Sequence, residues 1–154
     1  MGLNRREFVA TGLAATVLPR TSFAQMNDYE KGLYEAAKKE GELTWYIAHY
    51  TSETAERVGR TFTQKYPDVK VNVVRTTAQV AFQRLSQDID AKVANCDVFA
   101  TTDVGHCVSL KKRGLLMTFK PKGAEDFAPV FRNVDKDDQF HTTSATFVSV
   151  LHNT

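Results

Sequence analysis

Ten polar residues fall into three short clusters that could together hold a small solute. Each cluster is rich in hydroxyl groups, and one contains an arginine. Hydroxyls and the free N–H groups at helix starts suit a small anion or a polyhydroxylated solute, and an arginine can hold a carboxylate or phosphate through paired hydrogen bonds. The candidate ligand-binding residues are His49, Tyr50, Thr51 and Ser52, then Arg75, Thr76 and Thr77, then Thr101, Thr102 and Asp103.

The same residue types also have a structural use. Ser, Thr and Asp cap helices and form turns in most folds, so capping explains each cluster as well as ligand binding does. His49 and Tyr50 could enter a cleft, but as lone residues they could equally be packing residues. The sequence leaves both interpretations open, and the equivalent positions of the three clusters favour binding.

No catalytic or metal-binding motif accompanies the clusters. The chain has no Gly-x-Ser-x-Gly elbow, glycine-rich phosphate loop, His-Glu-x-x-His or Cys-x-x-Cys. Cys96 and Cys107 match no metal-ligand spacing, so they are either free thiols or, in an oxidising compartment, a disulfide. We therefore expect a binding protein with no metal and no cofactor, not an enzyme. The alternative is an exported α/β hydrolase, which would need a nucleophile and a base brought together by the fold.

Alternating helix and strand patterns place the clusters in a fold. Apolar periodicity predicts four helices. The first is capped at Asn27-Asp28 and ended by Gly41, the second is ended by Pro67, the third spans 78–94 and the fourth ends at Arg113. Strands rich in β-branched and aromatic residues are predicted at 42–48, 69–74 and 97–100. This spacing is typical of successive β-α-β units, so the expected fold class is α/β with a mostly parallel sheet and flanking helices. Each cluster then follows the carboxyl end of a strand, where open parallel sheets bind ligands.

The first 24 residues have the features of an export leader. Arg5-Arg6-x-Phe8 precedes a short, weakly apolar run, and Ser22-Phe23-Ala24 is a small-x-small cleavage pattern. We interpret residues 1–24 as a twin-arginine leader, with a general-secretion leader or an ordinary helix as alternatives. The apolar run is about half the ~20 residues that cross a bilayer. The mature chain is therefore expected in the periplasm without membrane insertion.

The leader also accounts for the basic charge of the chain. The sequence has 20 Lys and Arg against 18 Asp and Glu, and removal of Arg5, Arg6, Arg20 and Glu7 leaves 17 of each sign. A neutral mature chain of mixed charges gives no support for nucleic-acid or anionic-membrane binding.

The order of the segments resembles a known family. After the leader come E-G-E-L-T-W-Y-I-A-H-Y, F-T-Q-K-Y-P-D-V-K-V-N-V-V-R-T-T, D-V-F-A-T-T-D and L-K-K-R-G-L-L. This order is similar to the first lobe of periplasmic solute-binding proteins of ABC importers, in the ferric-iron and organic-anion branch of the type II fold. The resemblance implies that residues 25–154 are the N-terminal lobe, with the second lobe missing and 146–151 as the crossover strand. It also implies a permease in the inner membrane as partner.

The resemblance leaves the solute open. Iron-binding members take a His from the first loop and a Glu from the second β-α unit, where this chain has Thr51 and Gln79. An iron complex, an organic acid or a sugar phosphate therefore all remain candidate solutes. Half a cleft buries only part of a solute and cannot close, so we expect weak binding or none. The effector-binding half of a transcription regulator shares the fold, but the leader and the lack of a helix-turn-helix argue against it.

Overall fold

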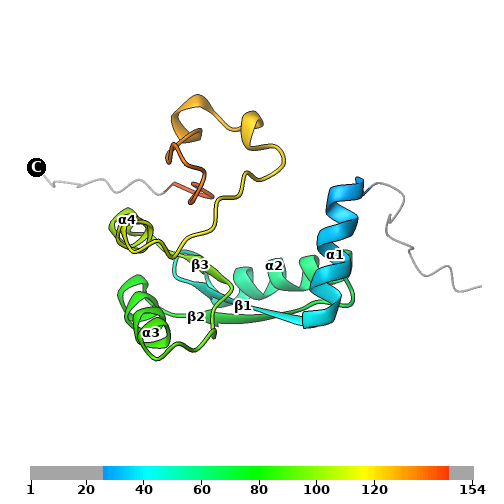
Figure 1. Cartoon of the computed structure of the whole chain (residues 1–154), viewed down its shortest axis with the longest axis horizontal. Coiled ribbons are helices and arrows are strands. Elements are labelled where there is room, and N and C mark those ends of the chain that lie inside the picture. The colour runs from blue at the N-terminus through cyan, green and yellow to red at the C-terminus, as the bar shows by residue number, and fades with distance from the viewer. Residues whose placement is uncertain (1–25, 146–154) are drawn as a thin grey trace, which may run out of the picture.

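The computed structural model describes residues 26–145 as an α/β fold (Figure 1). The expected leader and the expected crossover strand at 146–151 lie outside the described residues. The elements are α1 (Asp28–Glu40), β1 (Glu42–Ile47), α2 (Ser52–Lys65), β2 (Lys70–Arg75), α3 (Ala78–Asp90), β3 (Val98–Ala100), α4 (Val104–Lys112) and the short 3-10 helices η2 (Ala124–Asp126) and η3 (Pro129–Phe131). The predicted α/β class is confirmed.

The sheet consists of three parallel strands in the order β2-β1-β3. β1 lies in the centre and pairs along its whole length with β2, from Glu42 opposite Lys70 to Ile47 opposite Arg75. The central position explains why Tyr46 and Ile47 are fully buried. No helix within 26–145 is long and apolar enough to cross a membrane.

Helix boundaries follow local capping chemistry. Asn27 accepts a hydrogen bond from the Glu30 N–H at the start of α1, and Gly41 ends that helix with a φ of 77° that favours glycine. The predicted end of α3 was wrong, because the helix stops at Asp90 rather than at residue 94. Lys92 has a positive φ of 58°, which breaks the helical path.

The helices pack on the sheet through small residues and a few large ones. Gly59 of α2 lies so close to β2 that a Cβ atom would meet methyl groups of Val71 and Val73 at 3.3 Å. In α1 the buried residue is Tyr34, whereas its neighbour Leu33 is half exposed. Tyr34 is held there because its hydroxyl donates to Asp68 at 2.7 Å.

The segment after α4 has little regular structure and is tied to α4 by charge. The Lys111 ammonium pairs with the buried Asp135 and with Asp137, and the second carboxylate oxygen of Asp135 accepts from the Gln139 N–H. Figure 1 shows this segment beyond β3 and α4, off the sheet. Its last described residues turn back toward the end of β1, where Thr143 contacts His49.

Candidate functional site

The three predicted clusters meet at one edge of the sheet. Ile47, the last residue of β1, lies opposite Arg75 at the end of β2 and opposite Ala100 at the end of β3. The ladder continues one residue further on each side, since the Thr76 N–H donates to Ile47 and the Ala48 N–H donates to Ala100, both at 3.1 Å. The loops after the strands therefore start side by side, as the parallel-sheet prediction required.

Three of the ten candidates are helix caps. The Thr51 hydroxyl accepts from the Thr54 N–H, the Thr77 hydroxyl from the Val80 N–H, and the Asp103 carboxylate from the Gly105 N–H. Capping therefore accounts for Thr51, Thr77 and Asp103. It also means that α2, α3 and α4 all begin at this edge, so three positive helix ends are gathered there. Ser52, Thr76 and Thr102 complete the same turns, with Ser52 and Thr102 exposed.

Arg75 is positioned by the neighbouring loop. Its Nε donates to the Tyr50 carbonyl at 2.9 Å, which joins the loops after β1 and β2. The side chain is exposed, and its terminal N–H groups are available for a second acceptor. An arginine oriented by a backbone carbonyl is a suitable site for a carboxylate or phosphate, because the fork geometry is already fixed.

His49 lies half-buried beside Tyr50, with ring centroids 4.4 Å apart. Its Nε2 is 3.3 Å from the Thr143 hydroxyl, and its Nδ1 is buried with no hydrogen-bond partner within 26–145. Burial lowers the pKa of His49, so the ring is neutral near neutral pH. A neutral imidazole offers one donor and one acceptor, but the buried Nδ1 can reach a solute only if the ring moves.

Thr143 was missed by sequence reasoning. It comes from the turn-rich region after α4, where no periodicity or motif marked a functional residue. Nothing in the sequence indicated that this region returns to the end of β1.

A hydroxyl, an imidazole and a carboxylate also line up in the loop after β3. His106 Nδ1 is 3.0 Å from the Thr101 hydroxyl, and its Nε2 is 3.6 Å from Asp103. The order resembles a hydrolase triad, but His106 is only 7% exposed and stacks flat on Phe82 at 4.1 Å. The Thr101 hydroxyl also accepts from the Asp103 N–H. The arrangement therefore fixes the loop and presents no accessible nucleophile.

The cysteines and acidic residues do not form a reactive or metal-binding centre in the described part of the chain. Cys96 and Cys107 are free thiols. Burial raises the pKa of Cys96 to about 11, and burial also raises the pKa of Cys107 above its ordinary value. Both thiols therefore stay protonated and unreactive near neutral pH. Residues 26–145 contain no group of three or more His, Cys, Asp or Glu side chains that could hold a metal ion.

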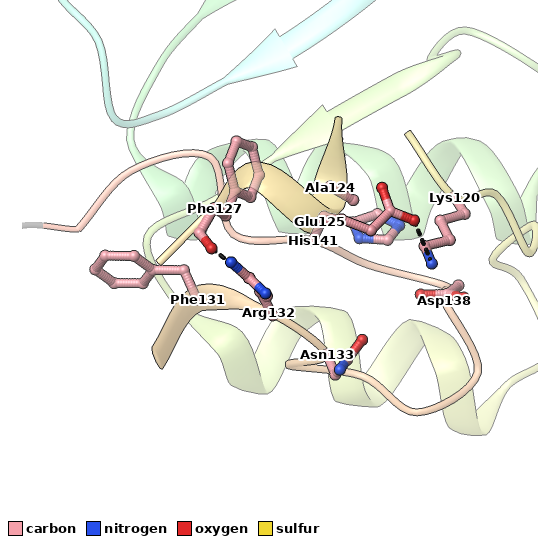
Figure 2. Close-up of a pocket in the computed structure, with 9 residues that line it drawn as sticks. All are labelled: Lys120, Ala124, Glu125, Phe127, Phe131, Arg132, Asn133, Asp138 and His141. Atoms are coloured by element: carbon pink, nitrogen blue, oxygen red, sulfur yellow. Dashed lines mark hydrogen bonds and ion pairs between the residues drawn. The ribbon is translucent and has the colours of Figure 1, made fainter. Parts of the chain in front are cut away.

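A separate pocket lies in the segment after α4 (Figure 2). It has a volume of about 170 Å³ and mixes charged, amide and aromatic side chains. Sequence reasoning did not identify it, because the region reads as a series of turns. Its lining residues are Lys120, Ala124, Glu125, Phe127, Phe131, Arg132, Asn133, Asp138 and His141.

Comparison with known proteins adds a distant likeness to solved structures. No protein-family model matches the chain, and no curated protein sequence matches it. The chain is similar to HitA from Pseudomonas aeruginosa, known from an iron-bound crystal structure, with 18% sequence identity and a TM-score of 0.49. The match covers 58% of this chain and 28% of the HitA chain, well under two thirds of that protein. A likeness of this size assigns neither a family nor a ligand to this chain.

Proposed function

We propose that residues 26–145 form one wall of a solute-binding cleft, as the first lobe of a periplasmic solute-binding protein of an ABC importer. The observation that carries the proposal is the register of the sheet, in which Ile47 lies opposite both Arg75 and Ala100. That register gathers three loops, three helix starts and one oriented arginine at a single edge, the usual ligand position in an open α/β sheet.

The chemistry of this edge favours a small anion. Its donors are the helix N-termini and the Arg75 guanidinium, and the neighbouring His49 is a neutral imidazole. The one carboxylate among the ten candidates, Asp103, already accepts a hydrogen bond from Gly105 at 2.8 Å. An organic acid, a sugar phosphate or an anionic iron complex would fit this edge. A polyhydroxylated solute is the other class that would fit, and it would bind through the Ser and Thr hydroxyls of the three loops.

The proposal includes export and a partner. Residues 1–24 would direct the chain to the periplasm, and an inner-membrane permease would receive the solute. A second lobe would supply the opposite wall of the cleft. With one wall alone, much of the solute stays in water, so we expect this chain to bind more weakly than micromolar.

Calorimetric titration with citrate, glucose 6-phosphate and glucose tests the proposal. We expect weak, saturable binding of an anion, reduced about tenfold by Arg75→Gln, which removes a charge-assisted contact. Arg57→Gln, an exposed arginine on α2, is the matched control and should change nothing. Equal effects of the two substitutions, or no anion binding at all, would contradict the proposal.

A further inference from the structure

We propose that the pocket after α4 is a second binding site, for a small zwitterionic solute of the free amino acid class. The pocket is built from η2, η3 and the turns around them (Figure 2), and its lining residues include none of the ten strand-end candidates. It is therefore distinct from the edge to which solute capture is assigned above.

The charges around the pocket are balanced, and part of them is already neutralised. Lys120 and Glu125 form an ion pair at 2.7 Å, and the hydrogen bond from Lys120 lowers the pKa of Glu125. Arg132 uses its Nε to donate to the Phe127 carbonyl. Within residues 26–145, no hydrogen bond or ion pair engages the terminal nitrogens of Arg132 or the carboxylate of Asp138.

Within residues 26–145, Arg132 and Asp138 interact electrostatically with Glu125 and Lys120 but form no ion pair with them, so each can still pair with a ligand group of opposite charge. Figure 2 shows Arg132 and Asp138 on opposite sides of the hollow, with the Lys120–Glu125 pair on the side of Asp138. A simple anion would gain Arg132 but lie near the carboxylates of Glu125 and Asp138, and a simple cation would meet the opposite difficulty. A zwitterion can place its carboxylate on Arg132 and its ammonium on Asp138, so both charges are paired.

The size and the remaining lining limit the solute further. A volume of about 170 Å³ is below the ~300 Å³ at which pockets for larger ligands begin. Phe127 and Phe131 provide apolar surface for a short aliphatic side chain, and the Asn133 amide can serve as donor or acceptor. A small amino acid such as L-alanine meets these conditions.

The wall that carries the free carboxylate is held in place by α4. Asp138 has a positive φ of 52°, a conformation that Asp adopts more readily than most residues. Its N–H donates to the Asp135 carbonyl at 3.3 Å, its carbonyl accepts from the Phe119 N–H at 2.9 Å, and Asp135 is bound to Lys111 of α4. The carboxylate is therefore presented by a fixed turn.

Titration of the full chain with L-alanine, followed by amide chemical shifts, tests the inference. We expect saturable shifts within 119–141 at millimolar concentrations, and much smaller shifts with propionate or ethylammonium, which carry one charge each. Arg132→Gln and Asp138→Asn should each weaken binding roughly tenfold or more. Asn tolerates the positive φ at 138, and Asp126→Asn on η2, outside the lining, is the matched control.

Three outcomes would overturn the inference: no saturable shifts with L-alanine, equal shifts with propionate alone, or equal affinity in both lining variants and the control. Citrate at the sheet edge should instead shift amides of the strand-end loops at 48–52, 75–77 and 101–103. Failure of the pocket and failure of solute capture are therefore distinguishable.

Discussion

Thr143 contacts His49 across 94 residues of chain, with its hydroxyl 3.3 Å from the imidazole Nε2. The contact brings the segment after α4 back to the edge where β1 ends. His49 is half-buried, and burial lowers its pKa because the charged ring would lose contact with water. A residue from the far end of the described chain thus lies against the imidazole at the proposed solute site.

The lowered pKa of His49 makes the stability of the fold depend on pH. Between the folded pKa and the ordinary value of 6.5, the unfolded chain binds more protons than the folded chain. The contribution of neutral His49 to the stability of the fold is therefore fully present above the unfolded pKa and is lost as the pH falls through the folded pKa. We expect the free energy of unfolding to decrease from neutral pH toward about pH 5, and less so in His49→Gln. Superimposable profiles, measured by urea unfolding, would show that His49 is not responsible.

Tyr34 should contribute measurably to stability through its hydroxyl. It is 3% exposed and donates to Asp68 at 2.7 Å, which ties α1 to the turn between α2 and β2. Tyr34→Phe should cost about 1–2 kcal/mol in urea unfolding, because the bond has a charged acceptor. Tyr29→Phe, on the same helix and 66% exposed, is the control and should be neutral. Equal effects would contradict this assignment.

Two helical glycines should respond differently to alanine. Gly32 in α1 has open space around it, so Gly32→Ala should stabilise the fold by about 0.5–1 kcal/mol through helix propensity. At Gly59 a Cβ would meet valine methyls at 3.3 Å, so crowding should cancel or exceed that gain. Thermal unfolding of both variants measures the difference, and an equal gain at both sites would show that α2 does not pack this closely on β2.

The Thr101–His106–Asp103 arrangement should not catalyse hydrolysis. His106 is buried against Phe82, so a substrate cannot approach the Thr101 hydroxyl and the imidazole together. We expect the purified chain to hydrolyse p-nitrophenyl acetate no faster than a catalytically inert protein, and Thr101→Val to leave that rate unchanged. Turnover abolished by Thr101→Val would favour the exported hydrolase instead.

Local chemistry made much of this fold predictable. Asn27 and Gly41 bound α1 as expected, and the strand starts near 42, 69 and 97 correspond to three parallel strands. The loops after these strands were therefore predictable as neighbours at one edge of the sheet. They contain Thr51 and Ser52, Arg75–Thr77 and Thr101–Asp103. These features depend on residues close in sequence, where propensity and capping decide the structure.

The features that sequence reasoning missed depend on contacts between distant residues. Thr143 contacts His49 at the end of a segment that the Lys111–Asp135 ion pair ties to α4, and no periodic pattern in the sequence indicates such an ion pair. The pocket around Arg132 and Asp138 likewise forms from turns with no periodicity. The same limit applies in α1, where the buried Tyr34 donates its hydroxyl to Asp68, a residue 34 positions further along the chain.

The central claim is that solute binds where the three strands end, and amide chemical-shift mapping with citrate tests it most directly. We predict saturable shifts concentrated in 48–52, 75–77 and 101–103, weakened in Arg75→Gln and unchanged in Arg57→Gln. Shifts confined to other parts of the chain, or no saturable shifts at millimolar citrate and glucose 6-phosphate, would contradict the account.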